Sequence, residues 1–128
     1  MCLRVIGDEL DPDIVTSLLN HQPTKAHKTG DDISSPKSRR KRIAKTGVWM
    51  LEAPTEEPGN INSQATYLLS NLSGDINAWK SISESYRIDL FCGLFMEETN
   101  EGIDLEPSVL YEIGKRGILI DFDIYGGD

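Results

Sequence analysis

The sequence predicts an α+β fold, a two-layer α/β sandwich in which helices cover mostly one face of a mixed sheet of about four or five strands. Segments with helical apolar spacing recur between short runs rich in β-branched residues, and this order implies crossover connections and some parallel pairing. The last run, 118–125, alternates apolar with charged residues, so one sheet face should be in water. With 128 residues, we expect a single domain over 1–128.

The first half of the chain predicts a strand, a helix and a second strand. A short apolar run at 3–6 is typical of a strand, and Gly7 ends it. Asp11 and Pro12 then start a helix, because an aspartate caps free amides and proline suits the first helical position. The buried stripe of that helix should hold Ile14, Val15, Leu18 and Leu19. Residues 42–53 read as a strand with both faces covered.

The second half predicts three helices and two strands. An amphipathic pattern over 61–72 indicates one helix, and Asp75 caps the next. The inner face of this second helix should hold Ile76, Trp79 and Ile82. Residues 88–96 predict a strand, Pro107 opens a fourth helix, and the alternating run described above completes the sheet. The order of the strands does not follow from these patterns.

Charge is unevenly distributed along the chain. The whole sequence has 13 basic and 21 acidic residues, a formal net charge of -8. Residues 25–45 contain eight basic and two acidic residues, a net charge of +6, whereas the remainder contains five basic and 19 acidic residues, or -14. The loop at about 29–42 is polar and has little to bury, so we expect it to be mobile. The acidic remainder opposes general affinity for DNA.

Several patterns bear on the compartment. No apolar run approaches the ~20 residues that cross a bilayer, and charged residues interrupt the start before a signal-peptide core forms. Two cysteines fit a reducing compartment rather than a disulfide framework. We therefore expect a cytoplasmic protein without a membrane partner.

The residue types that usually carry catalysis are not arranged for it. His21 and His27 lack the further ligands that zinc needs, so we interpret them as solvated loop residues. Cys92 lies in a predicted strand on the apolar face, where a core thiol is expected rather than a nucleophile. Nucleotide-binding and nucleophile motifs are missing from the sequence. We predict no catalytic residue, no metal and no cofactor.

Acidic residues are the main candidates for a binding surface. Three aspartates of two predicted strands should share the outer sheet face, where a solvated acidic surface is a better interpretation than a catalytic pair. Such a surface steers a basic protein partner toward it. The predicted partner-binding residues are Asp89, Glu97, Glu98, Glu101, Asp121, Asp123 and Tyr125.

Two alternatives stay open. The basic segment between Lys37 and Lys45 could bind phosphates or nucleic acid, although no aromatic residues interleave it. The competing interpretation is a solvated loop whose cations discourage edge-to-edge aggregation. The candidate phosphate-binding residues are Lys37, Arg39, Arg40, Lys41 and Arg42. A small-molecule sensor or an enzyme is the second alternative, which Trp49 and Trp79 would serve if they lined a pocket.

The order of landmarks along nearly the full chain resembles a family of small bacterial domains with no assigned function. The resemblance is carried by Leu3-Arg4-Val5-Ile6-Gly7 with Leu10-Asp11-Pro12, by Thr46-Gly47-Val48-Trp49, by Trp79, and by Leu119-Ile120-Asp121-Phe122-Asp123-Ile124-Tyr125. The basic insertion between Asp32 and Ile43 departs from a typical member, and the resemblance implies no catalytic residue. Acidic domains of this size that resemble no enzyme are often immunity proteins, which neutralise a toxin. We therefore expect a non-enzymatic immunity protein that blocks a toxin, for example a basic nuclease, in an oligomeric state left open.

Overall fold

A computed structural model describes residues 1–56 and 59–126. Its five-stranded sheet has the order β2-β3-β1-β4-β5. The strands are β1 (Cys2–Gly7), β2 (Lys25–His27), β3 (Gly47–Glu52), β4 (Arg87–Phe95) and β5 (Leu119–Tyr125). β4 and β5 pair in parallel, and the other neighbouring strands pair antiparallel. The predicted α+β fold with a mixed sheet is confirmed.

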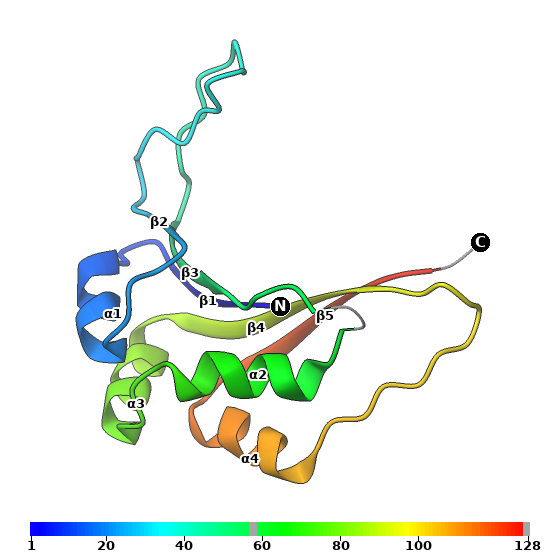
Figure 1. The fold of residues 1–128 in the computed structure, drawn as a ribbon. Coiled ribbons are helices and arrows are strands. Elements are labelled where there is room, and N and C mark those ends of the chain that lie inside the picture. Colours follow the sequence, from blue (N-terminus) through cyan, green and yellow to red (C-terminus); the bar gives the residue numbers. More distant parts are fainter. Residues whose placement is uncertain (57–58, 127–128) are drawn as a thin grey trace.

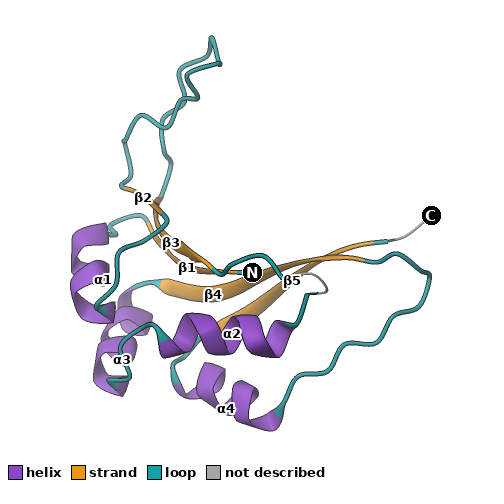
Figure 2. Cartoon of the chain, viewed as in Figure 1, coloured by secondary structure: helices purple, strands orange, loops and turns teal. Residues whose placement is uncertain are grey.

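The helices lie on one side of this sheet. They are α1 (Pro12–Leu19), α2 (Ile61–Ser70), α3 (Ile76–Ser85) and α4 (Pro107–Lys115). Figure 2 shows all four beneath and beside the strands, so that the opposite sheet face carries no helix of the described chain. None of these helices has the length and apolar character needed to cross a bilayer.

Three helices begin as the sequence predicts. The Asp11 carboxylate accepts a hydrogen bond from the Asp13 amide at 3.0 Å, and the Asp75 carboxylate accepts one from the Asn77 amide at 2.9 Å. Pro107 occupies the first turn of α4. The two carboxylate contacts satisfy amides that have no partner inside a helix, and Pro107 has no amide to satisfy, which is why each helix starts at these positions.

The core lies between the helices and the covered sheet face. Its completely buried large side chains include both tryptophans, Leu3, Val5, Val15, Leu19 and Leu68. The Trp49 indole nitrogen donates to the Thr16 hydroxyl at 3.0 Å, and that of Trp79 donates to the Ser73 carbonyl at 2.7 Å. Both indoles are therefore core side chains whose one polar atom is paired.

Local packing overturns some predicted details. Ile14 is 52% exposed, because Val15 and Leu19, one turn apart, define the buried line of α1. The strand predicted over 42–53 begins only at Gly47. β2 was not predicted as a strand, and it places His27 on an edge of the sheet instead of in a loop.

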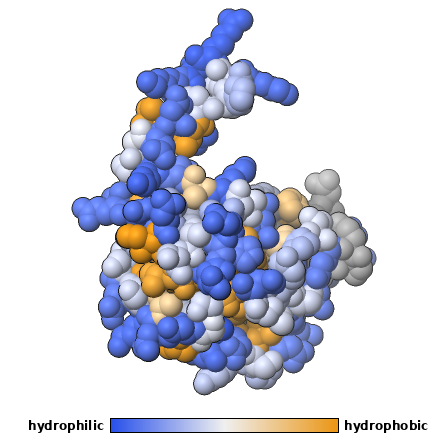
Figure 3. All heavy atoms as spheres, turned by 60° about the vertical axis from the view of Figure 1, so that its left-hand side comes forward, coloured by the Kyte–Doolittle hydropathy of each residue, from blue (hydrophilic) through white to orange (hydrophobic). Residues whose placement is uncertain are grey.

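Residues 28–46 form a projection, here called the basic arm, whose two sides run next to each other and which extends away from the body (Figures 1 and 3). Asp32 and Ile43 face each other across it. Backbone hydrogen bonds join Gly30 to Ala44 at 2.9 Å and Ile33 to Arg42 at 2.8 Å. Since mostly hydrophilic side chains cover the arm in Figure 3, its pairing depends on these bonds rather than on a core. The mobility of this segment stays a prediction.

Candidate binding surface

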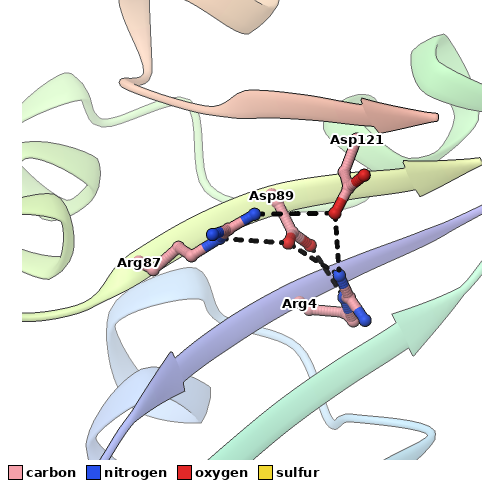
Figure 4. A network of polar contacts seen from close by, with 4 residues as sticks. All are labelled: Arg4, Arg87, Asp89 and Asp121. Atoms are coloured by element: carbon pink, nitrogen blue, oxygen red, sulfur yellow. Dashed lines mark hydrogen bonds and ion pairs between the residues drawn. The ribbon is translucent and has the colours of Figure 1, made fainter.

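A network of four charged side chains lies on the sheet face without helices. The pairing of β1 with β4 sets Arg4 opposite Asp89, and the parallel pairing of β4 with β5 sets Phe91 opposite Asp121. Because side chains alternate between the two faces of a strand, Arg4, Arg87, Asp89 and Asp121 all project to the same side. Figure 4 shows the four groups meeting across three neighbouring strands.

Asp89 is the centre of this network. Its side chain is completely buried, and its two carboxylate oxygens each accept a hydrogen bond of 2.8 Å from the Arg4 guanidinium. Arg87 lies 3.4 Å from the same carboxylate, and Asp121 lies 3.6 Å from Arg4 and 3.5 Å from Arg87. The hydrogen bonds to Asp89 raise the pKa of Arg4. Its guanidinium also stacks over Phe91, 4.5 Å from the ring centre.

The prediction that Asp89 belongs to a solvated acidic face is wrong. Two arginines and a neighbouring aromatic ring cover its carboxylate, and the four network charges sum to zero. The sequence shows the alternation that brings the aspartate to this face, but the strand order decides which cations lie beside it. Asp89 therefore links β4 to β1 through Arg4, and both arginines in turn contact Asp121 of β5. The side chain of Asp121 is 39% exposed and keeps contact with water.

Two exposed aromatic side chains stack at the far end of the same sheet face. Phe95 ends β4 and is 75% exposed, and Tyr125 ends β5 and is 48% exposed. Their ring centres lie 4.7 Å apart with an interplanar angle of 7°. The Tyr125 hydroxyl donates to the Asp123 carboxylate at 2.7 Å, and this bond raises the pKa of the phenol.

The predicted acidic loop starts at this aromatic pair. The Met96 amide donates to the Tyr125 carbonyl at 3.0 Å, which fixes where the chain leaves β4. The Glu101 carboxylate accepts hydrogen bonds from the Glu97 and Glu98 amides at 2.8 and 3.0 Å. We define the aromatic-acidic cluster as Phe95, Glu97, Glu98, Glu101, Asp123 and Tyr125, all of which except the half-buried Asp123 are exposed.

Five of the seven predicted partner-binding residues belong to the aromatic-acidic cluster, and the other two belong to the charged network. Sequence reasoning missed Phe95. The alternation of β4 could have found it, because Phe91 and Phe95 fall on the same face as Asp89.

The predicted phosphate-binding residues lie on the outer part of the basic arm. Lys37, Arg39, Arg40, Lys41 and Arg42 are all exposed. The ion pairs formed within the described residues involve other cations and none of these five. The Ser34 hydroxyl and amide lower the pKa of Asp32 at the middle of the arm. The arm therefore presents positive charge that the described body does not neutralise.

A groove of about 280 Å³ runs between α2 and α4. Its lining residues are Thr66, Leu69, Ser70, Ser108, Val109, Glu112 and Arg116. Arg116 is buried, donates to the Glu112 carboxylate at 2.6 Å and lies over the Trp79 ring. Arg116 and Lys115 lower the pKa of Glu112. The two charged residues that line the groove are therefore paired with each other.

The cysteines and histidines do not meet in a reactive arrangement. Burial raises the pKa of the Cys92 thiol and of the half-buried Cys2 thiol, which disfavours the nucleophilic thiolate. The His21 ring bonds the neighbouring Gln22 carbonyl at 2.7 Å. Over residues 1–56 and 59–126, no three His, Cys, Asp or Glu side chains converge as metal ligands would.

The fold and these surfaces define a small α+β domain with one open sheet face, an aromatic-acidic end and a projecting basic arm. The chain belongs to a domain family of unknown function, DUF4279, whose family model matches residues 1–127. Neither a curated protein nor a solved structure matches the chain. The family match confirms the predicted resemblance to a family with no assigned function, and it assigns no role to any residue.

Proposed function

We propose that this protein is a non-enzymatic binding protein, a cytoplasmic immunity protein that blocks the basic surface of a toxin domain. The observation that carries this proposal is the aromatic-acidic cluster, in which two stacked and exposed rings stand among carboxylates. Aromatic side chains are preferred anchors of protein interfaces because they bury large area at little cost in conformational entropy. Carboxylates around them steer a basic partner and exclude partners of the wrong charge.

The balance of free charges on the body supports a basic partner. Four of the five cations outside residues 25–45 form ion pairs within the chain: Arg4 and Arg87 with the network aspartates, and Lys115 and Arg116 with Glu112. Carboxylates therefore dominate the field of the body. A nuclease needs a cationic surface to hold phosphates, so an acidic protein that covers this surface would block it.

The proposal is tested by co-expression with the protein encoded by the adjacent upstream gene. We expect protection from growth arrest and a complex in pull-down experiments that weakens between about 0.05 M and about 0.5 M salt, because the Debye length shortens. The triple variant Glu97→Lys/Glu98→Lys/Glu101→Lys should weaken the complex at least about tenfold.

A matched control separates a specific surface from general charge. Asp8→Lys/Glu9→Lys/Glu84→Lys makes the same change in net charge at exposed positions outside the cluster, and it should leave most of the affinity intact. Absence of protection, or equal weakening by both triple variants, contradicts the proposal.

A second candidate function is binding of nucleic acid through the basic arm. The five cations of the outer part of the arm favour it, because they are exposed, form no ion pair within the described residues, and phosphate contacts need clustered positive charge. With a double-stranded DNA oligonucleotide or a single-stranded RNA as probe, we expect a mobility shift whose log affinity falls linearly with log salt. Arg39→Glu/Arg40→Glu/Arg42→Glu should abolish this shift, whereas the control Lys25→Glu/Lys80→Glu/Lys115→Glu, which makes the same change in net charge at exposed positions outside the arm, should retain it. A flat salt response, or no shift of the unmodified protein, ends this candidate.

A further inference from the structure

We propose that the partner binds by strand addition, with an extended segment of alternating basic and apolar residues pairing along the outer edge of β5. This inference rests on the proposed function, because it takes the partner to be a basic protein. The inference adds two details to the proposed function: the strand edge to which the partner binds, and the order of basic and apolar side chains along the partner's segment.

The edge formed by β5 has no protection against pairing other than its two aspartates within the described chain. β5 is the last strand of the sheet and pairs only with β4, so the outward amides and carbonyls of its seven residues have no strand beside them in the described chain. Proteins shield such edges with lysine, proline or very short strands. The opposite edge follows this rule, since β2 has three residues and carries Lys25. β5 contains no basic residue and no proline.

Apolar side chains are exposed on both faces of β5. On the open face, Leu119 is 49% and Tyr125 is 48% exposed; on the opposite face, Phe122 is 38% and Ile124 is 58% exposed. Figure 1 shows that the ends of β4 and β5 extend past the helices. Phe122 lies opposite the buried Cys92 and is exposed although it is not at the end of its strand, as a residue of an edge strand can be. A strand added beside β5 would cover side chains on both faces at once.

The charges of β5 define what the added strand must carry. Asp121 and Asp123 alternate with Phe122 and Ile124, so a neighbouring strand places cations beside the aspartates and apolar side chains beside the other two. Asp121 already contacts both network arginines, so Asp123 is the principal acceptor for a partner cation. Main-chain hydrogen bonds give such a complex its affinity, and the alternating side chains give it specificity.

The same aspartates argue against a second copy of this chain on the edge. Two β5 strands pairing side by side would bring aspartates of both copies onto the same face, where like charges repel. Charge on this edge therefore selects against self-association and in favour of a cationic strand.

The test uses the full chain and synthetic peptides of alternating lysine and valine as the probe. We expect the unmodified peptide to slow exchange of outward-facing amides within Leu119–Tyr125, measured by NMR. A peptide N-methylated along both edges should bind at least about tenfold more weakly, because it cannot donate main-chain hydrogen bonds. A peptide with its lysines grouped at one end should also bind more weakly. Equal binding of all three peptides, or binding of none, overturns strand addition.

Variants of the chain separate this inference from the proposed function. Phe122→Lys/Ile124→Lys installs the missing edge protection and should abolish peptide and partner binding. The control Leu110→Lys/Tyr111→Lys changes two exposed apolar residues of α4 in the same way and should leave binding intact. If the co-expressed partner still binds the β5 variant but not the Glu97→Lys/Glu98→Lys/Glu101→Lys variant, strand addition fails while the proposed function stands. The inference is also overturned if the unmodified chain self-associates and the β5 variant does not, because the β5 edge then binds a second copy of the chain.

Discussion

Asp89→Ala should lower the free energy of unfolding by about 3 kcal/mol, near the lower end of the cost of breaking a buried ion pair. The substitution removes the acceptor of two 2.8 Å hydrogen bonds and leaves two guanidinium groups side by side. The cost stays near the lower end because the side chains of Arg4 and Arg87 are 24% and 54% exposed, so water can still hydrate them. Urea unfolding measures the loss.

Two further variants make this result specific. Asp123→Ala removes an aspartate from the same face, and its cost should stay within about 1 kcal/mol because it loses one exposed hydrogen bond. The double variant Arg4→Met/Asp89→Leu should recover most of the stability, since apolar replacement of a buried pair is often neutral. Equal costs for Asp89→Ala and Asp123→Ala would show that the network does not stabilise the fold.

If the proposed function holds, Phe95→Ser and Tyr125→Ser should each weaken the complex with the co-expressed partner by about 2 kcal/mol, a loss of about 30-fold in affinity. The stacked rings are the largest exposed aromatic surface among the carboxylates, so truncation removes the anchor while the steering charges remain. Titration calorimetry measures the affinity. Stability should change little, because Phe95 is three-quarters exposed before binding.

The matched control for the aromatic pair is Tyr111→Ser. Tyr111 is 66% exposed on α4 and is not part of the aromatic-acidic cluster. Its truncation should leave the affinity unchanged. If all three serine variants weaken the complex equally, the pair is not an anchor, and the binding surface lies elsewhere.

Elements with strong local determinants could be predicted from the sequence. Asp11 and Asp75 set helix starts through hydrogen bonds two residues along the chain, and Pro107 does so through its own fixed backbone angle. The alternation of β5 is local as well. β2 could not be predicted, because three residues are too few to show the alternation of a strand. Its extended conformation depends on pairing with β3, which is distant in the sequence. The strand predicted from residue 42 was too long for a related reason, since residues 42–44 pair with the other side of the basic arm rather than with the sheet.

The candidate surface was predictable only in part. Acidic residues after β4 and along β5 could be recognised by type, and the fold brings most of them to one end. The role of Asp89 depends on Arg4, which lies 85 residues away in the sequence. The residues next to Asp89 in the sequence do not indicate that an arginine so far away will pair with it. Phe95 was missed because an aromatic residue in a strand is usually a core residue, and its exposure results from how far the helix layer extends.

The central position of β1 constrains how the chain acquires its structure during synthesis. β1 pairs with β3 on one side and with β4 on the other, so its second neighbour leaves the ribosome only after more than half of the protein has been made. Until then, Leu3 and Val5 have only part of their final surroundings, and Arg4 has no carboxylate to hold it. Closing so long a loop carries an entropic cost that the later contacts must offset. The β1–β3 pair therefore has an open edge on its β4 side during that part of synthesis, with outward backbone groups of β1 that still lack their partners.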